Sequence, residues 1–507
     1  MSDYRNFITS FLVEENAPTS KFIKQEIFNT PIIDDFIKWN VDNIFSFDNL
    51  SKARIICVGQ VQSGKTINII KCIERAMQKN YDCIIVFGGI NKILLKQTNN
   101  RVKQQLGNKF SDFGYTQLYP DQHSEIAQLI KKKTKLVICI TKENTALKSI
   151  ANQIKKNIIG KDTKFLIIDD ESDYGTINSG ANEYDNSAFY KYLEEIYNEL
   201  QSCKLLYFTA TPYGNILSDK KTKSDEPKIV VLKNSNEYFG IDKSMTLNNF
   251  YLSNQKINKE IISDDSQLRQ LIFLTITIYL IGASQLKMDN PTKGDIKSQC
   301  LINLSSATDD HYEHKYKVEK IINMFVELSD FEIKNIIIKT ISGWNINCDF
   351  CNQNEDFQNK FIEHSKEIIN YIKDNKSFYT LNGKAESGKG DFLEKTFNHE
   401  IIIGGVMLSR GVTFENLITE LIVNDVEMVY VDTLLQRCRW FGYRNNISKY
   451  MKIIIPARIY EALKIAKKYV NLFSPGIQDY EDIKRDLIYL DQESNNVKGT
   501  RHDKSHK

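Results

Sequence analysis

The chain has 507 residues, 41% of them hydrophobic and 26% charged, and its formal net charge is +3 at pH 7. This length allows about two or three domains with sizeable cores. A net charge so close to zero excludes binding of a polyanion through bulk charge alone, so a nucleic-acid site would depend on where lysine and arginine are placed. The nine cysteines are scattered along the chain, which favours a reducing cytoplasm over a disulfide framework.

No segment of the sequence predicts secretion or insertion into a membrane. The N-terminus lacks a basic region followed by an apolar run, so we expect no signal peptide. The most apolar stretch, Leu271 to Ala283, is shorter than the ~20 residues that cross a bilayer and predicts a buried helix. We therefore expect a cytoplasmic protein with no membrane partner.

Residues 59–66 read Gly-Gln-Val-Gln-Ser-Gly-Lys-Thr and match the pattern GxxxxGK(S/T) at every fixed position. A β-branched run precedes them and an apolar pattern of helical spacing follows, which is the strand–loop–helix context of a phosphate-binding P-loop. Lys65 is expected to reach the β- and γ-phosphates, and the Thr66 hydroxyl to bind Mg²⁺. A glycine turn with a chance Lys-Thr is the structural alternative, which the flanking elements disfavour. The motif predicts an ATP site formed by Gly59, Gln62, Ser63, Gly64, Lys65 and Thr66.

From Ala53 onward the first half of the chain alternates between strand and helix patterns, which predicts an α/β fold with a parallel sheet covered on both faces. We expect strands at Arg54–Val58, Cys83–Phe87, Leu136–Ile140, Phe165–Ile168 and Leu205–Phe208. Ligands of such sheets bind beyond the carboxyl ends of the strands.

An acidic run, Asp169-Asp170-Glu171-Ser172-Asp173, follows one of these strands directly. A buried strand that ends in acids is what a Walker B element requires, with one carboxylate to hold Mg²⁺ and another to orient water. We assign Asp170 to Mg²⁺ and Glu171 to water activation, and keep Asp169 as the rival metal ligand. The next strand ends in Thr209-Ala210-Thr211-Pro212, a weak motif alone that gains weight from its order after Walker B.

A connector is predicted at residues 236–294, and a second α/β series follows it. Its expected strands are Cys300–Leu304, Asn335–Ile341, Ser377–Leu381, Ile401–Gly404, Leu421–Val423 and Met451–Ile455. A near-match to the P-loop, Gly383 to Lys389, is followed by Gly390, so it lacks the metal-binding hydroxyl and predicts a surface loop. A pair of similar domains, of which only the first has a P-loop, is the domain arrangement of a two-lobed motor.

Arginine-rich motifs in the second half complete the candidate site. A glutamine and three arginines within a short span suit contact with phosphate across a cleft between two lobes, where an arginine stabilises the charge of the transferring phosphoryl group. A solvated basic helix is the alternative. We assign catalytic roles to Gln436, Arg439 and Arg444, with Arg439 preferred as the arginine finger, and nucleotide contacts to Arg410 and Gly411.

Taken together, these motifs resemble superfamily 2 helicases, and more closely the Z-one domain family, helicase-like proteins of bacterial restriction and phage-defence neighbourhoods that are often labelled endonucleases. The residues that carry the resemblance are Val61–Thr66, Asp169–Asp173, Thr209–Pro212, Leu408–Gly411 and Asp432–Arg444. The match covers roughly Ile55 to Pro456. It implies two RecA-like parallel-sheet domains with N- and C-terminal helical additions, and an ATP-hydrolysing motor that acts on nucleic acid, DNA in particular, in antiviral defence. A partner protein from the same defence system is a further implication.

The expected domain organisation follows from these patterns. It comprises an N-terminal helical segment (1–44), a RecA-like domain with the P-loop (45–235), a helical connector (236–294), a second RecA-like domain (295–460), and a C-terminal helical segment with a solvated tail from Lys498 (461–507).

Two weaker patterns and two rival functions stay open at this point. Cys348 and Cys351 with His311 and His314 have zinc-like spacing, and Glu332-Ile333-Lys334 fits part of a nuclease motif that needs a strand-borne acid. Both patterns are common by chance. The rival functions are an ATP-gated switch that binds a partner protein without translocating, and an endonuclease.

Overall fold

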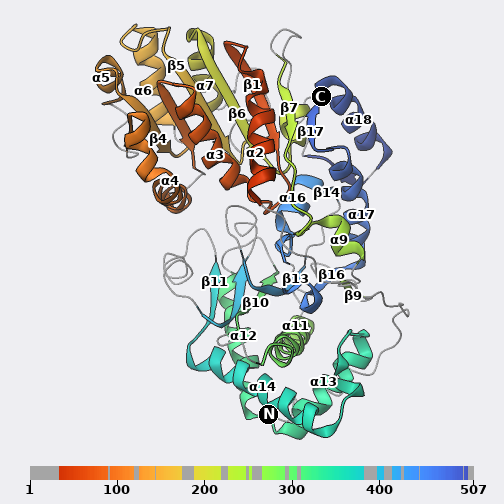
Figure 1. Cartoon of the computed structure of the whole chain (residues 1–507). Helices are drawn as coiled ribbons and strands as arrows, with labels where there is room; N and C mark the ends of the chain where they lie inside the picture. Colours follow the sequence, from red (N-terminus) through yellow and green to blue (C-terminus); the bar gives the residue numbers. More distant parts are fainter. Residues whose placement is uncertain are drawn as a thin grey trace. The chain divides into compact units, whose positions relative to one another are not determined.

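The computed structural model describes residues 33–88, 92–118, 125–142, 144–173, 188–217, 226–246, 250–253, 265–291, 296–304, 310–381, 397–404, 414–423, 428–444, 446–494 and 496–500. The chain divides into two compact units, shown in Figure 1. The P-loop unit comprises the described residues of Asn29–Tyr238, Met428–Gln436 and Lys464–Lys507. The second unit comprises those of Phe239–Glu427 and Arg437–Leu463.

The P-loop unit is built on an eight-stranded sheet in the order β17-β7-β1-β6-β5-β2-β4-β3. All neighbouring strands are parallel except β17, which runs antiparallel to β7. The strands are β1 (Lys52–Val58), β2 (Cys83–Phe87), β3 (Tyr115–Leu118), β4 (Lys135–Ile140), β5 (Lys164–Asp170), β6 (Ser202–Thr209), β7 (Lys228–Val231) and β17 (Gly476–Gln478). The central strands are almost continuously apolar and buried, as parallel strands covered on both faces must be.

Helices cover both faces of this sheet. On one face, α2 (Ile33–Ile44), α3 (Lys65–Gln78) and α4 (Lys92–Phe113) share a core with the strands. On the other face, α7 (Ala188–Glu199) packs on α6 (Asn144–Lys155) and places Phe189 against Phe87 of β2, with ring centroids 4.9 Å apart. The remaining elements of the unit are η1 (Phe45–Phe47), α5 (Ile126–Lys131), α8 (Tyr213–Leu217), β14 (Val429–Tyr430), α18 (Tyr480–Glu493) and β18 (Val497–Lys498).

The C-terminal part of the chain is an integral part of the P-loop unit. Strand β18 pairs with β14 in parallel, and Thr500 donates a hydrogen bond to the Asp432 carboxylate at 2.9 Å. The prediction of a solvated tail from Lys498 is wrong for this residue, which lies in β18. The buried side chains of Val497 and Thr500 hold this segment in the unit. The chain passes between the units at residues 238–239, 427–428, 436–437 and 463–464, so α16 (Val431–Arg437) and α17 (Ala457–Asn471) each have residues in both.

The second unit has a six-stranded, all-parallel sheet in the order β11-β12-β10-β13-β16-β9. Its strands are β9 (Phe250–Ser253), β10 (Ser298–Asn303), β11 (Phe378–Leu381), β12 (His399–Gly404), β13 (Leu417–Ile422) and β16 (Lys452–Pro456). Its helices are α9 (Ile241–Thr246), α11 (Asp265–Met288), α12 (Asp310–Glu327), α13 (Asp330–Trp344) and α14 (Glu355–Asp374). Short elements are β8 (Tyr238–Phe239), η4 (Asp349–Asn352), β15 (Gly442–Tyr443) and η6 (Ser448–Tyr450).

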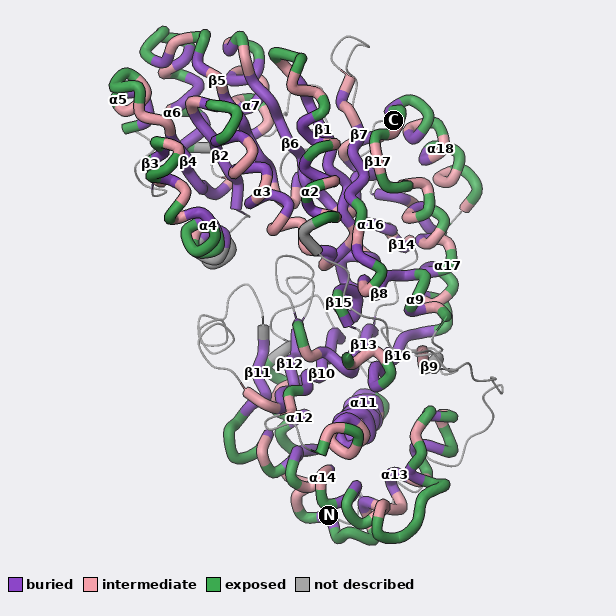
Figure 2. The backbone as a smooth tube through the Cα atoms, in the orientation of Figure 1, coloured by how far each residue is buried: buried purple, intermediate pink, exposed green. Residues whose placement is uncertain are grey.

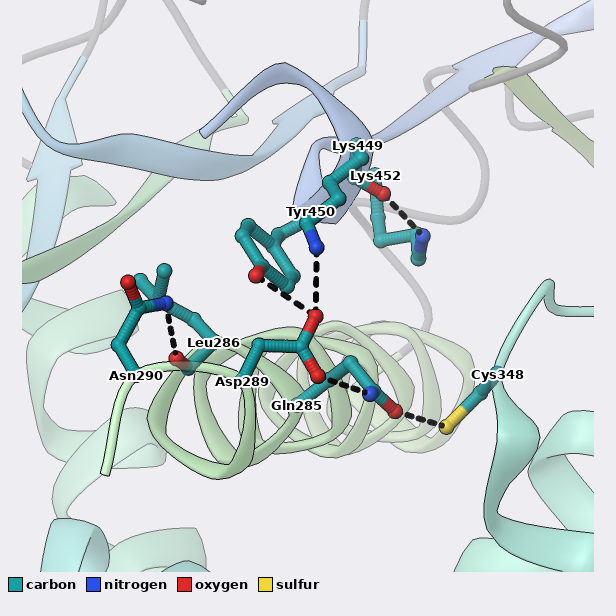
Figure 3. A network of polar contacts seen from close by, with 8 residues as sticks. All are labelled: Gln285, Leu286, Asp289, Asn290, Cys348, Lys449, Tyr450 and Lys452. Atoms are coloured by element: carbon teal, nitrogen blue, oxygen red, sulfur yellow. Dashed lines mark hydrogen bonds and ion pairs between the residues drawn. The ribbon is translucent and has the colours of Figure 1, made fainter. Parts of the chain in front are cut away.

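Helix α11 is the central core helix of the second unit, as the apolar stretch of the sequence predicted. Its apolar side chains are buried in the same cluster as residues from β10, β13, α12 and α14. It is the one helix of the described residues long and apolar enough to cross a membrane, but most of that apolar window is buried inside the unit (Figure 2). Figure 3 shows how its last turns are fixed: Asp289 accepts hydrogen bonds from Lys449 Nζ at 2.6 Å and from Tyr450 Oη at 2.8 Å.

Most strand predictions are confirmed, but one is wrong. Residues Asn335–Ile341 belong to α13, whose first turn has a capping box between Ser329 and Glu332. The β-branched run Ile336–Ile338 is compatible with a strand and with a buried helix alike, and the cap decides for the helix. Glu332 therefore lies at the exposed start of a helix, accepting from the Ser329 amide at 2.9 Å, and is not the strand-borne acid that a nuclease of this kind needs.

Candidate active site

Three sequence motifs lie at the carboxyl ends of three adjacent strands of the P-loop unit. The P-loop follows β1, the Thr-Ala-Thr motif begins at the last residue of β6, and the acidic run begins with the last two residues of β5, in the sheet order β1-β6-β5 (Figure 1). Because these strands are parallel, their carboxyl ends lie at one edge of the sheet, where ligands of α/β folds bind. The amide of Gly59 donates to the Thr209 carbonyl at 3.0 Å, and the amide of Ser172 donates to the Phe208 carbonyl at 3.0 Å. These two contacts join the three motifs through the end of β6.

The P-loop has a conformation that depends on its two glycines. Gly64 caps the N-terminus of α3 with a left-handed φ of +83°, which favours glycine. A Cβ at Gly59 would lie 2.8 Å from Lys65 Cγ, so a side chain there would displace the lysine. Lys65 and Thr66 then occupy the first turn of α3, where the amides and the helix dipole favour an anion.

A buried asparagine pair supports the loop from the N-terminal helix α2. Asn40 donates to Asn68 Oδ1 at 3.0 Å, and Asn68 donates to the Gly64 carbonyl at 3.2 Å. Tyr238 Oη donates to the Val61 carbonyl at 2.5 Å on another part of the loop. These contacts have no local signal in the sequence, because an asparagine in an amphipathic helix is typical of a polar surface residue.

The acidic run after β5 separates into residues with different surroundings. Asp169 is buried, and its Oδ1 lies 2.7 Å from Lys142 Nζ. Asp170 is half-buried as a residue, and the burial of its carboxyl, followed by the charge of Glu171, raises its pKa, while Lys65 and Lys142 oppose the rise. Since Asp169 already pairs with a lysine, the arrangement favours Asp170 as the metal ligand.

The hydroxyl of Thr66 and the carboxylate of Asp170 are hard oxygen donors, the kind that Mg²⁺ prefers. They lie on α3 and at the end of β5, two elements that pack on each other. The donor chemistry therefore fits Mg²⁺, and the predicted ligand pair stays a prediction.

Asp173 is the centre of a buried polar network that the sequence did not single out. It accepts hydrogen bonds from Thr209 Oγ1 at 3.2 Å, Thr211 Oγ1 at 3.3 Å and Gln436 Nε2 at 2.7 Å. Gln436 also donates to Thr211 Oγ1 at 2.9 Å. Gln436 thus belongs to the P-loop unit, although its neighbours Arg437 and Arg439 belong to the second unit. The network gives the Thr-Ala-Thr motif and Gln436 one shared carboxylate.

The arginines of the same motif surround a different carboxylate, Glu420 on β13 of the second unit. The Arg439 amide donates to Glu420 Oε2 at 3.1 Å, and Arg437 donates to Asn303 Oδ1 at 3.0 Å. Burial raises the pKa of Glu420 to about 8, and the charges of Arg439, Arg437 and Arg444 oppose the rise. All three arginines are buried.

Arg444 is held by main-chain acceptors. Its guanidinium donates to the carbonyls of Glu415 at 2.7 Å, Arg439 at 3.0 Å and Trp440 at 3.4 Å. Such a set of contacts is typical of an arginine that fixes a turn.

Three other predictions from the sequence either lie outside the described residues or find no support in them. Arg410, Gly411 and the near-match 383–390 lie outside the described residues. Cys351 is exposed, Cys348 donates to Gln285 Oε1 at 3.3 Å, and His314 is buried in α12. No group of three or more metal-ligating side chains occurs within the part of the chain that the structure describes, so the zinc interpretation finds no support there.

Two family models match successive parts of the chain. The family model described as "Type III restriction enzyme, res subunit" matches residues 35–214, and the family model described as "Z1 domain" matches residues 272–492. No curated protein sequence matches the chain. The two matches cover successive parts of the chain, the first over most of the P-loop unit, and agree with a helicase-like fold of two parallel-sheet units.

The match to the Z1 domain confirms the resemblance to the Z-one domain family for the second half of the chain.

Solved structures show distant likenesses to the whole chain. The ATP-dependent Type ISP restriction-modification enzyme LlaBIII bound to DNA is 13% identical with a TM-score of 0.46, over 94% of this chain and 32% of that one. S. cerevisiae Dbp5 bound to RNA and ADP BeF3 is 12% identical with a TM-score of 0.42, over 86% and 89%. The DUF1998 helicase MrfA bound to DNA is 10% identical with a TM-score of 0.43, over 90% and 51%. The chain thus spans about a third of the length of the restriction-modification enzyme.

Proposed function

We propose that this chain is an ATP-hydrolysing, helicase-like motor that acts on nucleic acid, with DNA as the expected form, in bacterial restriction or antiviral defence. ATP and Mg²⁺ are its cofactors, and it works in the cytoplasm, alone or with a partner protein of the same defence system. The observation that carries the proposal is the convergence of three motifs on the adjacent strands β1, β6 and β5.

In the proposed reaction, residues at the carboxyl ends of these strands and residues of the second unit have separate roles. Lys65 would neutralise charge on the β- and γ-phosphates, and Thr66 with Asp170 would hold Mg²⁺, which would supply further positive charge to the phosphates. Glu171 orients the attacking water from the position that follows Asp170. An arginine of the second unit, Arg439 in first place, stabilises the charge of the transferring phosphoryl group. Arg410 and Gly411 are proposed nucleotide contacts.

The direct test is the rate of ATP hydrolysis by the purified chain without nucleic acid and with single-stranded DNA, double-stranded DNA or RNA. The wild-type chain is expected to hydrolyse ATP faster with DNA, and the affinity for DNA is expected to fall steeply as salt rises. Lys65→Ala is the matched control and should bind DNA but lose hydrolysis. Hydrolysis that Lys65→Ala leaves intact would show that the activity arises elsewhere.

Two other outcomes would replace the proposal. ATP hydrolysis that no nucleic acid changes, together with no DNA binding at low salt, would favour an ATP-gated switch that binds a protein. DNA cleavage that co-purifies with the chain and disappears in Glu332→Ala would favour the endonuclease, although Glu332 lies in a helix cap.

A further inference from the structure

Lys142 brings a buried positive charge to the acidic turn from a strand that none of the recognised motifs uses. It follows β4 by two residues, and in the sheet order β5-β2-β4 it reaches beyond the neighbouring strand β2 to the end of β5. Its Nζ lies 2.7 Å from Asp169 Oδ1 and donates to the Glu171 carbonyl at 2.7 Å. The Lys142 side chain is only 4% exposed and that of Asp169 only 1% exposed.

A buried ion pair of this kind is not explained by stability alone. Removing an ammonium and a carboxylate from water costs several kcal/mol per ion, and an apolar pair of similar size would be as stable or more so. The same ammonium contacts the backbone of the next turn, however, which an apolar residue could not do. The ion pair therefore fixes Lys142 where it can hold the Glu171 carbonyl.

The Glu171 backbone needs such a contact. Its φ of +56° lies in the left-handed region, which a residue with a side chain seldom adopts and which costs about 1–3 kcal/mol. Asp169, which pairs with Lys142, and Asp170, the proposed metal ligand, are the last two residues of β5, and the turn begins at Glu171, the proposed water-activating residue. A rotation of the peptide at Glu171 would redirect this residue, which directly follows Asp170.

We propose that Lys142 is a positioning residue for ATP hydrolysis, which locks the Asp169–Glu171 turn through the Asp169 carboxylate and the Glu171 carbonyl. The inference rests on the proposed function and adds a residue that no motif in the sequence identified. The proposed role of Lys142 involves no contact with the nucleotide. Its loss should lower turnover more than nucleotide affinity, because the P-loop itself is intact.

The test compares three variants by kcat, by KM for ATP and by the affinity for a fluorescent ATP analogue. Lys142→Met keeps the length of the side chain and removes its charge, and is expected to lower kcat by about 10²-fold with little change in nucleotide affinity. Lys142→Arg keeps a donor and a charge and should recover much of the loss. Lys135→Met is the matched control at the opposite end of β4, where Lys135 donates to Asn80 at 2.7 Å on the surface, and should behave as wild type.

A pair of substitutions keeps the test decisive where Lys142→Met does not fold. Lys142→Met combined with Asp169→Asn removes both buried charges, so it should fold and still show the low kcat. A kcat within about twofold of wild type in that pair or in Lys142→Met, or an equal loss in Lys135→Met, would overturn the inference. Failure of the proposed function is distinguishable, because the wild-type chain would then hydrolyse ATP no faster than Lys65→Ala.

Discussion

Asp173 of the P-loop unit and Glu420 of the second unit are both buried carboxylates, and different kinds of groups act on them. The hydrogen-bond donors to Asp173 include two threonine hydroxyls and the Gln436 amide, all neutral. Glu420 accepts from a backbone amide and lies in the field of three arginines. In both units, basic side chains act on acids near the candidate site. Lys65 and Lys142 act on Asp170 in the P-loop unit, and Arg437, Arg439 and Arg444 act on Glu420 in the second unit.

The largest expected effect tests whether an arginine beside Glu420 also serves catalysis. Arg439→Ala should lower turnover by about 10³-fold while ATP affinity changes little, since an arginine finger acts mainly in the transition state. The measurements are kcat and equilibrium binding of ATP. A normal kcat would leave Arg439 with its role beside Glu420 alone.

Arg444→Ala is the matched comparison. It removes the donor to three main-chain carbonyls, so its main effect should be a loss of stability on the order of 3 kcal/mol. Thermal unfolding of both variants separates the two effects. Loss of kcat in a stable Arg444→Ala protein would instead make Arg444 the finger.

A smaller effect is expected from Glu171→Gln, which tests the acidic run of the P-loop unit. The substitution keeps the size of the side chain and removes the charge that activates water, so turnover should fall about 10²-fold while nucleotide still binds. Single-turnover hydrolysis and a filter-binding assay with labelled ATP measure the two quantities. Turnover that is insensitive to this change would contradict the Walker B assignment.

Gln436→Ala should act more mildly, because it removes one neutral donor from Asp173 and leaves the two threonines. The loss of a buried hydrogen bond predicts a fall in kcat of about tenfold. Gln436→Glu places a second carboxylate beside Asp173 and should be the more harmful variant. Equal activity of the two variants would show that the network does not depend on the charge of its members.

The last prediction concerns stability and not activity, and its sign follows from a pKa. Burial lowers the pKa of Lys452 at the start of β16 to about 8, whereas the unfolded chain keeps an ordinary value of about 10.4. The folded state therefore carries a penalty that is complete below about pH 8 and disappears as the pH rises toward the unfolded value. Lys452→Met should raise stability by roughly 2–3 kcal/mol at neutral pH, and the gain should shrink near about pH 9.5.

Lys449→Met is the control for this prediction, because Lys449 is an exposed lysine paired with Asp289. Its loss should change stability by less than about 1 kcal/mol. Unfolding midpoints of both variants at the two pH values provide the comparison. A gain for Lys452→Met that does not depend on pH would show that packing, not charge, is responsible.

The sequence predicted the elements whose signal is local. The P-loop and the acidic strand end could be identified because each is a short run of residues whose chemistry depends on spacing, and the apolar strands because parallel strands are buried on both faces. The strand predicted at Asn335–Ile341 is wrong for a local reason as well, since the capping box of Ser329 and Glu332 favours a helix over the strand that the β-branched run suggests.

Contacts between distant segments could not be predicted in this way. Asn40 supports the P-loop through Asn68, and Lys142 reaches the Walker B turn from a different strand. Each residue looks like a polar surface residue in its own segment. Likewise, nothing local distinguishes Gln436 from Arg437, although the two belong to different units.

The composition of the P-loop unit has a consequence for the order in which the protein is made. Its edge strand β17 and the strand β18, which pairs with the segment before Gln436, follow β7 by more than two hundred residues. At a synthesis rate of about 5–20 residues per second, the ribosome needs on the order of 10–50 seconds to supply them. Until then a nascent chain has the complete P-loop and the acids of β5 but not the partner strand that seats α16. The contacts of β17 and β18 can therefore form only after the P-loop and the acids of β5 have been made.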